Sequence, residues 1–370
     1  MVFKESTTII IYGQNDREDA MKKIIIDGTA IGDGCPPYIV AETSANHNGS
    51  IDRAKEIMLQ AKQCGANAIK LQTYTADTIT INSNADDFLI KGGLWDGQSL
   101  YELYRSAETP FEWHKPLFDY AKSIHLTCFS TPFDESAVDL LEDLNAPAYK
   151  IASFEAIDLP LIKYVASTGK PMIISTGMAN QCEIEEAVNC AKEAGCQDLI
   201  LLHCISSYPA PIAQSNLLTI PDMAKRFDVL TGLSDHTLGT TVSIASVALG
   251  ACFVEKHFTL SRQDKGPDSE FSLEPHELSE LCFKSKEAWL SLGHAGYEQK
   301  EAEKQNLQFR RSLYFVSDLK AGQIISESDV RSIRPGFGIA PKFYTDVLGK
   351  KVNQPVSRGT AVDWNYLVNN

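Results

Sequence analysis

No apolar run in the sequence approaches the roughly 20 residues that a helix needs to cross a bilayer. Residues 1–23 also lack the basic start, long apolar stretch and small-residue cleavage site of a signal peptide. We therefore expect no membrane partner, and we interpret residues 1–23 as an N-terminal extension outside the fold.

Basic residues are scarce relative to acidic ones. Lys and Arg total 34 of the 370 residues, and Asp and Glu total 48, which gives a formal net charge of −14. Nucleic acids and anionic membranes bind proteins through basic surfaces, so this balance argues against both kinds of partner. If the ligand is an anion, its site must gather positive charge locally.

Paired cysteines are absent as well. The nine cysteines are spread singly, and no two form a Cys-x-x-Cys motif. An odd number without paired spacing argues against a disulfide framework and favours a reducing, cytoplasmic location. The same spacing argues against a cysteine-based zinc site.

Eight short apolar runs, each followed by polar residues and then by a segment of helical period, occupy residues 24–292. The runs are continuous rather than alternating, as in strands buried on both faces of a parallel sheet. Eight strand–helix units in about 250 residues predict a (β/α)8 (TIM) barrel. A doubly wound sheet is the alternative, but no Gly-x-Gly-x-x-Gly motif follows the first strand. The predicted strands are 38–42, 68–72, 126–132, 148–153, 171–177, 199–204, 229–236 and 252–259.

One connection is too long for a compact barrel. Between the second strand and a helix beginning near Phe111 lie about 35 residues, where most connections have two to six. This connection contains KGGLWDGQSLYELY at 91–104. Long connections are commonly lids or binding loops, and the alternative is a variable surface excursion.

The composition changes after Trp289. Residues 293–308 are polar and have no apolar face, which predicts a linker. Residues 309–370 contain a weak internal repeat, in which 319–325 is similar to 356–362. Two similar halves predict a small separate domain with a pseudo-two-fold axis.

Polar side chains gather at the carboxyl ends of the predicted strands, where the loops of a parallel barrel open. Buried without partners, each would cost about 1–3 kcal/mol, so their number at one end indicates a site. They are Glu42, Lys70, Gln72, Ser130, Thr131, Lys150, Ser153, Glu155, Ser175, Thr176, Ser206, Ser234, Asp235, His236, Glu255, Lys256 and His257.

Two histidines end consecutive strands of this set. Adjacent strands lie about 4.8 Å apart, so His236 and His257 can share one divalent metal. Two imidazoles leave positions of an octahedral ion open to water and ligand oxygens, which favours Mn²⁺ or Mg²⁺ over a closed zinc site. The alternative is a pair of hydrogen-bonding histidines without a metal.

Lys70 and Lys150 supply local positive charge from the second and fourth strands. Neighbouring hydroxyl groups add neutral donors, which together favour a phosphate or carboxylate ligand. Either lysine could instead form a Schiff base, as in barrel aldolases. Glu42 and Glu155 are candidates for acid–base work or sugar contacts, or else for structural salt bridges.

Ten motifs resemble, in order, those of the sialic acid synthase family, the phosphoenolpyruvate-dependent nonulosonate synthases. The resemblance runs from about residue 24 to the C-terminal domain, which is similar to the antifreeze-like (SAF, β-clip) domain of these enzymes. KGGLWDGQSLYELY and YKIASFE resemble the pseudaminic acid synthase branch. The ten motifs are AETSANHNGS (41–50), IKLQTYT (69–75), FSTPFD (129–134), YKIAS (149–153), ISTGM (174–178), YPAP (208–211), GLSDHT (232–237), EKHF (255–258), GPD (266–268) and IRPGFG (333–338).

The resemblance implies a reaction. Phosphoenolpyruvate would condense with the open-chain aldehyde of 2,4-diacetamido-2,4,6-trideoxy-L-altrose and with water, giving pseudaminic acid and phosphate. Two departures from the family pattern, Thr43 and Ser206, touch the sugar pocket. Synthesis of N-acetylneuraminate or legionaminic acid from another hexosamine is therefore the first alternative. A Schiff-base aldolase and an inactive, sugar-binding barrel are more distant ones.

The resemblance also implies residue roles and partners. An Mn²⁺ or Mg²⁺ ion would be held by His236 and His257, and a domain-swapped homodimer would bring Arg334 to the partner's barrel. The implied catalytic residues are Glu42, Lys70, His236 and His257. The implied phosphoenolpyruvate ligands are Lys70, Thr131, Lys150, Ser153, Ser175, Ser206 and Ser234. The implied sugar ligands are Gln72, Glu155, Tyr208, Asp268 and Arg334.

Overall fold

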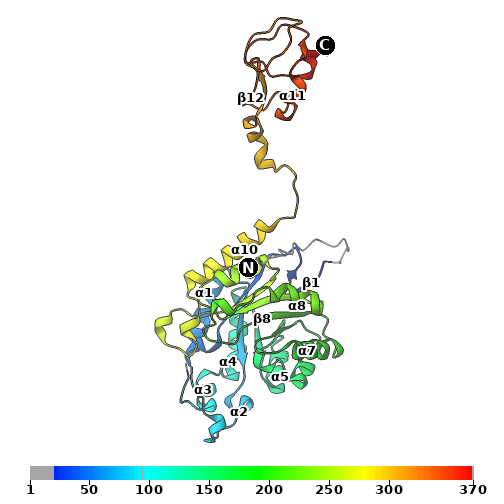
Figure 1. Cartoon of the computed structure of the whole chain (residues 1–370). Helices are drawn as coiled ribbons and strands as arrows, with labels where there is room; N and C mark the ends of the chain where they lie inside the picture. Colours follow the sequence, from blue (N-terminus) through cyan, green and yellow to red (C-terminus); the bar gives the residue numbers. More distant parts are fainter. Residues whose placement is uncertain (1–20, 94, 369–370) are drawn as a thin grey trace, which may run out of the picture. The chain divides into compact units, whose positions relative to one another are not determined.

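The computed structural model describes residues 21–93 and 95–368 (Figure 1). Most of the predicted N-terminal extension, residues 1–20, lies outside the described residues. The chain divides into two compact units, one ending at Gly293 and the other beginning at His294. Within the described residues, no helix is long and apolar enough to span a bilayer.

Eight parallel strands close into a barrel in the first unit. The last strand pairs with the first, with Phe253 opposite Tyr38 and His257 opposite Glu42. This closure confirms the predicted fold, and the doubly wound alternative is wrong. The strands are β3 (Tyr38–Glu42), β4 (Ala68–Thr73), β5 (Thr127–Pro132), β6 (Tyr149–Ile151), β7 (Met172–Ser175), β8 (Leu199–Cys204), β9 (Leu230–Asp235) and β10 (Phe253–His257).

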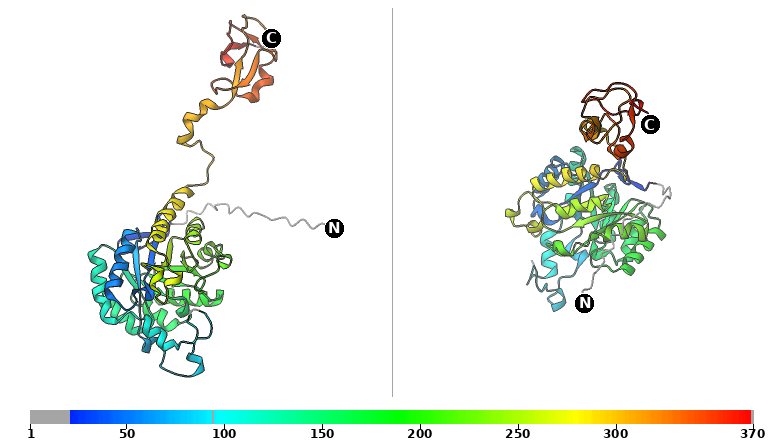
Figure 2. Two further views of the ribbon diagram at one scale, coloured as in Figure 1. Left: turned by 90° about the vertical axis from the view of Figure 1, so that its left-hand side faces the viewer. Right: turned by 45° about the horizontal axis from the view of Figure 1, so that its top comes forward.

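Helices cover the outside of the barrel (Figure 2). The first begins after Ser50, whose side chain accepts a hydrogen bond from the Arg53 backbone N–H and so caps the helix. Its apolar face, including Ile57 and Met58, packs against outward-facing strand residues such as Ile69. The covering helices are α1 (Ile51–Gln63), α4 (Phe111–Ser123), α5 (Glu135–Asp143), α6 (Leu159–Ala166), α7 (Gln181–Glu193), α8 (Thr219–Phe227), α9 (Thr241–Ala248) and α10 (Pro275–Leu292).

A hairpin that the sequence did not predict closes the amino-terminal end of the barrel. It consists of β1 (Lys23–Ile26) and β2 (Thr29–Gly32), paired antiparallel. Three of its four isoleucines, Ile24, Ile26 and Ile31, join one apolar cluster with barrel-interior residues that include Phe129 and Phe253. Burial of each isoleucine is worth about 1.5–3 kcal/mol, so the hairpin belongs to the core.

The long connection after β4 forms a separate lobe, residues 74–110, which we call the β4–α4 lobe. It contains α2 (Ala76–Ile79), the 3-10 turn η2 (Asp86–Phe88) and α3 (Leu100–Ala107). Figure 1 shows α2 and α3 beyond the end of the barrel opposite to β1. The lobe therefore lies at the carboxyl ends of the strands, where the βα loops gather.

The second unit has its own small core, and its two halves pair as the predicted repeat requires. Leu319 and Val356, the first residues of the two similar stretches, exchange backbone hydrogen bonds of 2.9 and 3.0 Å. Reciprocal pairing of equivalent residues is what a pseudo-two-fold axis produces. The elements are η7 (Glu301–Phe309), β11 (Ser312–Phe315), β12 (Val330–Ile333), η8 (Pro341–Phe343), α11 (Tyr344–Val347), β13 (Lys351–Val352), η9 (Trp364–Tyr366) and β14 (Leu367–Val368).

Candidate active site

The two-residue period of a strand decides which polar side chains enter the barrel. On β10, Phe253 faces the interior core, so Glu255 and His257 also face inward while Lys256 faces the helices. Lys256 pairs with Asp235 at 2.8 Å, and Asp235 accepts a hydrogen bond from Ser243 of α9. These two charged residues therefore stabilise the packing of α9, and they do not line the site.

Two other members of the strand-end set also lie outside the barrel. The Ser130 hydroxyl bonds to Thr73, whose own hydroxyl contacts His114 of α4. Thr176 donates its hydroxyl to the Leu202 carbonyl oxygen. Ser130 and Thr176 therefore do not line the site, because their side chains lie on the face of the barrel that meets the helices.

A buried charge network occupies the centre of the barrel's open end. Lys70 Nζ lies 2.8 Å from Glu42 Oε2 and donates to Thr131 Oγ1 at 3.0 Å. Glu255 Oε1 lies 3.8 Å from Lys70 Nζ and 3.9 Å from Lys150 Nζ. Four buried ionisable groups from β3, β4, β6 and β10 thus converge.

Burial and pairing shift the pKa values within this network. Burial raises the pKa of the Glu42 carboxyl to about 7, although Lys70 opposes the shift. Burial alone would lower the pKa of Lys70, but the Glu255 and Glu42 carboxylates raise it above its usual value. Burial lowers the pKa of Lys150, against the attraction of Glu255. Lys70 is therefore held as a cation. Lys150 is the lysine whose charged form an added anion would stabilise most.

Small residues and hydroxyl groups form a cradle at the ends of β6, β7 and β8. The Gly177 backbone N–H donates to Ser153 Oγ at 3.1 Å. A Cβ atom on Gly177 would lie 2.2 Å from Ser206 Oγ and 2.7 Å from Ser153 Oγ, so only glycine leaves this space open. Ser175 Oγ is buried and has no hydrogen-bond partner among the described residues. Hydroxyl groups of this kind can donate to a phosphate or carboxylate.

The two predicted metal-binding histidines lie side by side. Their ring centroids are 5.4 Å apart. His236 donates its Nδ1 proton to the Ile205 carbonyl oxygen at 2.9 Å, which leaves a lone pair on Nε2. His257 Nδ1 is buried without a hydrogen-bond partner among the described residues, and burial keeps the pKa of this imidazole well below its usual value.

These features fit a divalent ion held by two imidazoles. Within residues 21–93 and 95–368, no three His, Cys, Asp or Glu side chains come together as metal ligands would. An ion at His236 and His257 would therefore complete its coordination with water and substrate oxygens. Asp268 Oδ2, at 4.0 Å from His257 Nδ1, lies next to this position.

The predicted sugar ligands surround the histidine pair. Gln72 Nε2 donates to Glu42 Oε1 and to Ser44 Oγ, both at 2.9 Å, and the Ser44 hydroxyl donates to Asp268 Oδ2. The Tyr208 ring lies 4.4 Å from the His236 ring. This chain of contacts joins the charge network to the histidines, so the structure brings Gln72, Tyr208 and Asp268 to one site.

Two predicted sugar ligands occupy different surroundings. Glu155 Oε2 is buried without a partner among the described residues, and burial raises the pKa of this carboxyl to about 7. Arg334 follows β12 in the second compact unit, where its side chain is exposed. Its contribution to a sugar site stays a prediction.

Comparison with known proteins identifies the family. A model of the NeuB family matches residues 57–297, and a model of the SAF domain matches residues 310–368. The chain belongs to the NeuB family. It is 44% identical over 325 residues to a pseudaminic acid synthase of Campylobacter jejuni, covering 88% of this chain and 95% of that protein. It is 42% identical over 327 residues to one of Helicobacter pylori, covering 88% and 96%.

A solved structure extends the similarity to the NeuB fold. The N-acetylneuraminic acid synthetase of Leptospira borgpetersenii, in complex with citrate, matches with a TM-score of 0.70 and 30% sequence identity. The match covers 78% of this chain and 96% of that chain. The resemblance that the ten motifs indicated is therefore confirmed.

Sequence reasoning gave no role to several residues of this NeuB-family site. Glu255 stands among the strand-end residues, but only the strand register shows that it lies between both lysines. Phe271, 4.9 Å from the His257 ring, and Trp95, 6.1 Å from the Tyr208 ring, come from loops whose paths no motif revealed. The two-residue period through Phe253 and His257 would have identified Glu255.

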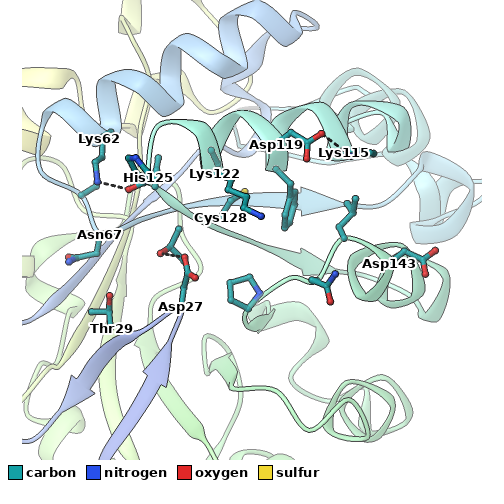
Figure 3. Close-up of a pocket in the computed structure, with 18 of the residues that line it drawn as sticks. Asp27, Thr29, Lys62, Asn67, Lys115, Asp119, Lys122, His125, Cys128 and Asp143 are labelled. Atoms are coloured by element: carbon teal, nitrogen blue, oxygen red, sulfur yellow. Dashed lines mark hydrogen bonds and ion pairs between the residues drawn. The ribbon is translucent and has the colours of Figure 1, made fainter.

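A cavity of about 960 Å³ lies at the opposite end of the barrel (Figure 3). Asn67 and Thr127, which line it, stand at the amino-terminal ends of β4 and β5. Several of its charged groups are engaged locally: Lys62 donates to the His125 carbonyl oxygen, and Lys115 pairs with Asp119. None of the predicted site residues lines it, so the chemistry belongs to the other end.

Proposed function

We propose that this chain is a pseudaminic acid synthase. It condenses phosphoenolpyruvate with 2,4-diacetamido-2,4,6-trideoxy-L-altrose and water, and it releases pseudaminic acid and phosphate. The observation that carries the proposal is the pair of buried lysines beside a cradle of hydroxyl groups, next to two histidines. The identity of 42–44% to two pseudaminic acid synthases supports the choice of sugar.

The lysines and the cradle suit the anionic donor. Phosphoenolpyruvate carries a carboxylate and a phosphate, which are the groups that ammonium ions and hydroxyl donors bind. Lys70 presents a cation beside Thr131. Lys150, with Ser153, Ser175, Ser206 and Ser234, would hold the second anionic group. Because the whole chain has a net charge of −14, the two lysines are the local positive charge that attracts the donor.

Glu42 stands where a carboxylate can assist the carbon–carbon bond. Lys70 and Gln72 hold its two oxygens in place. Attack of the enol carbon on the aldehyde leaves cationic character at the enol-ether carbon, and a fixed adjacent carboxylate stabilises that charge. Water then adds to this carbon, and the hemiketal expels phosphate.

The proposal includes a divalent ion, Mn²⁺ or Mg²⁺, at His236 and His257. When bound, such an ion supplies Lewis-acid polarisation of the sugar aldehyde. Hydrogen bonding of His236 to Ile205 orients that imidazole, and Tyr208 and Phe271 flank the pair and limit water access.

Phosphate release with a panel of hexosamines tests the proposed reaction. Phosphoenolpyruvate with the diacetamido L-altrose sugar is expected to give the highest kcat/KM. Higher turnover of N-acetylmannosamine or of the manno-configured diacetamido sugar would instead assign N-acetylneuraminate or legionaminic acid synthesis. Absence of phosphate release with every sugar would contradict the reaction itself.

The Schiff-base alternative is tested by borohydride trapping. Lys150, whose pKa burial lowers, is the lysine that an aldolase would use, because Lys70 is held as a cation. We expect no covalent adduct with pyruvate and loss of activity with EDTA. A borohydride-stable adduct on Lys150 in the presence of EDTA would favour the aldolase.

The proposal also includes a cytoplasmic homodimer in which the SAF domains are exchanged. Arg334, exposed in its own unit, would then reach the sugar in the partner's barrel. A mixture of Arg334→Ala and His257→Ala chains tests this arrangement. Exchange predicts recovery of activity in mixed dimers, because one intact barrel meets one intact Arg334. No recovery after verified subunit mixing would show that Arg334 does not act across the dimer.

A further inference from the structure

The β4–α4 lobe brings one indole ring to the open end of the barrel. The segment around Trp95 is a tight loop, closed by hydrogen bonds from Ile90 N to Gln98 O and from Gly97 N to Ile90 O, both 2.9 Å. The isolated bridge between Leu89 and Ser99 fixes its base. From this loop the Trp95 ring reaches within 6.1 Å of the Tyr208 ring.

The indole nitrogen of Trp95 is a buried hydrogen-bond donor. Its Nε1 is shielded from solvent and has no hydrogen-bond partner among the described residues. An indole N–H can only donate, and a buried donor without an acceptor is unfavourable. Nearly all buried polar groups find a partner, so a missing acceptor at an open site indicates one that a ligand supplies.

A second unpartnered polar atom among the described residues is Glu155 Oε2, in the loop after β6. Tyr104 of α3 is close enough to Glu155 for the carboxylate to raise the tyrosine's pKa, which burial already raises. The Tyr104 ring also packs edge-on against Tyr74, at 5.9 Å. The lobe and the loop after β6 therefore face a common space.

Trp95 lies further from the histidine pair than Tyr208 does. Tyr208 packs against both His236 and His257, at 4.4 and 6.3 Å between ring centroids. Among the ring contacts of the described residues, Trp95 has one with Tyr208 and none with either histidine. If the aldehyde carbon reacts beside the histidines, Trp95 meets the part of the sugar beyond C2.

We propose that Trp95 is a specificity-determining residue whose indole N–H donates a hydrogen bond to the carbonyl oxygen of the acetamido group at C4 of the sugar. The inference rests on the proposed function, because it names the substrate group that this site recognises. An amide carbonyl is a strong acceptor, and its methyl group can pack against the Tyr208 and Trp95 rings. A hydroxyl group at C4 extends less far from the sugar ring than an acetamido group does, and it has no methyl group.

A substitution that removes the N–H and keeps an aromatic ring tests this role. Trp95→Phe is expected to lower kcat/KM for the diacetamido sugar by about tenfold or more, since a buried hydrogen bond is lost. The same variant should leave kcat/KM unchanged for 2-acetamido-2,6-dideoxy-L-altrose, which has a hydroxyl at C4. The KM for phosphoenolpyruvate should also stay unchanged.

Trp289→Phe on α10 is the matched control, because it makes the same substitution on a covering helix. It should leave both sugars unaffected. An equal loss with both sugars in Trp95→Phe, or no loss with either, would overturn the inference while phosphate release by the wild-type chain still supported the reaction. Failure of the wild-type chain to release phosphate with any hexosamine would count against the proposed function instead.

Discussion

The two ends of the barrel interior are built on the same strands and have opposite chemistry. Toward the amino-terminal end, the inward positions carry Val40, Phe129 and Phe253, which pack with the isoleucines of the β1–β2 hairpin. Toward the carboxyl end, the same strands carry Glu42, Thr131 and His257. On β3 and β5 a step of two residues, about 7 Å along the strand, separates the stabilising layer from the reactive one, and on β10 the step from Phe253 to His257 is four residues. Stability and chemistry can therefore be changed independently along a single strand.

Substitution at the reactive end of β10 should give the largest effect. His257→Ala is expected to lower phosphate release by about a thousandfold or more, because the proposed ion, which would polarise the aldehyde by several kcal/mol, would lose one of its two imidazole ligands. Its thermal unfolding midpoint should stay close to that of the wild type. His276→Ala, an exposed position on α10, serves as control. Full activity of His257→Ala in metal-free buffer would refute the metal assignment.

Substitution at the other end of the same strand should change stability. Phe253 is fully buried and stacks on Tyr38 with ring centroids 5.5 Å apart. Phe253→Ala should lower the free energy of unfolding by about 3–5 kcal/mol, since it leaves a cavity in the closed end. Urea unfolding measures the loss, and Phe253→Leu should lose less. A stable Phe253→Ala protein that lacks activity would contradict the separation of the two layers.

The pH dependence of catalysis tests the role of the Glu42 carboxyl at the reactive end of the barrel. The pKa of Glu42 is raised to about 7 by burial, so its carboxylate is lost as the pH falls through 7. We expect kcat/KM to fall about tenfold per pH unit below this value. Glu155 has a similar pKa of about 7, so the profile of Glu155→Gln separates the two groups. An acidic limb that disappears in Glu155→Gln would exclude Glu42 as its source.

The barrel and most of its site could be predicted because both depend on local patterns. Continuous apolar runs identified the eight strands, and the polar residues ending them included Glu42, Lys70 and both histidines. Strand register was the missing information. Asp235 and Lys256 adjoin His236 and His257 in the sequence, yet they face α9, whereas Glu255 faces the lysines.

Two other features depend on packing between distant segments. The hairpin strands β1 and β2 have four residues each, and their isoleucines become core only against the closed end of the barrel. The β4–α4 lobe is polar and contains only short helices, so no periodic pattern predicts where its loop directs Trp95. Both features required the assembled structure.

The β1–β2 hairpin at the amino-terminal end of the barrel has a consequence for the order in which the two substrates bind. With its isoleucines packed into the core at that end, the described loops at the other end, the β4–α4 lobe among them, form the side from which reactants reach the site. Lys70 and Lys150 stand on the strands, deeper than Tyr208 and Trp95 in the loops above. A site approached from one side fills in order of depth, so we expect the three-carbon donor to bind before the sugar and a bound sugar to hold it until the bond has formed.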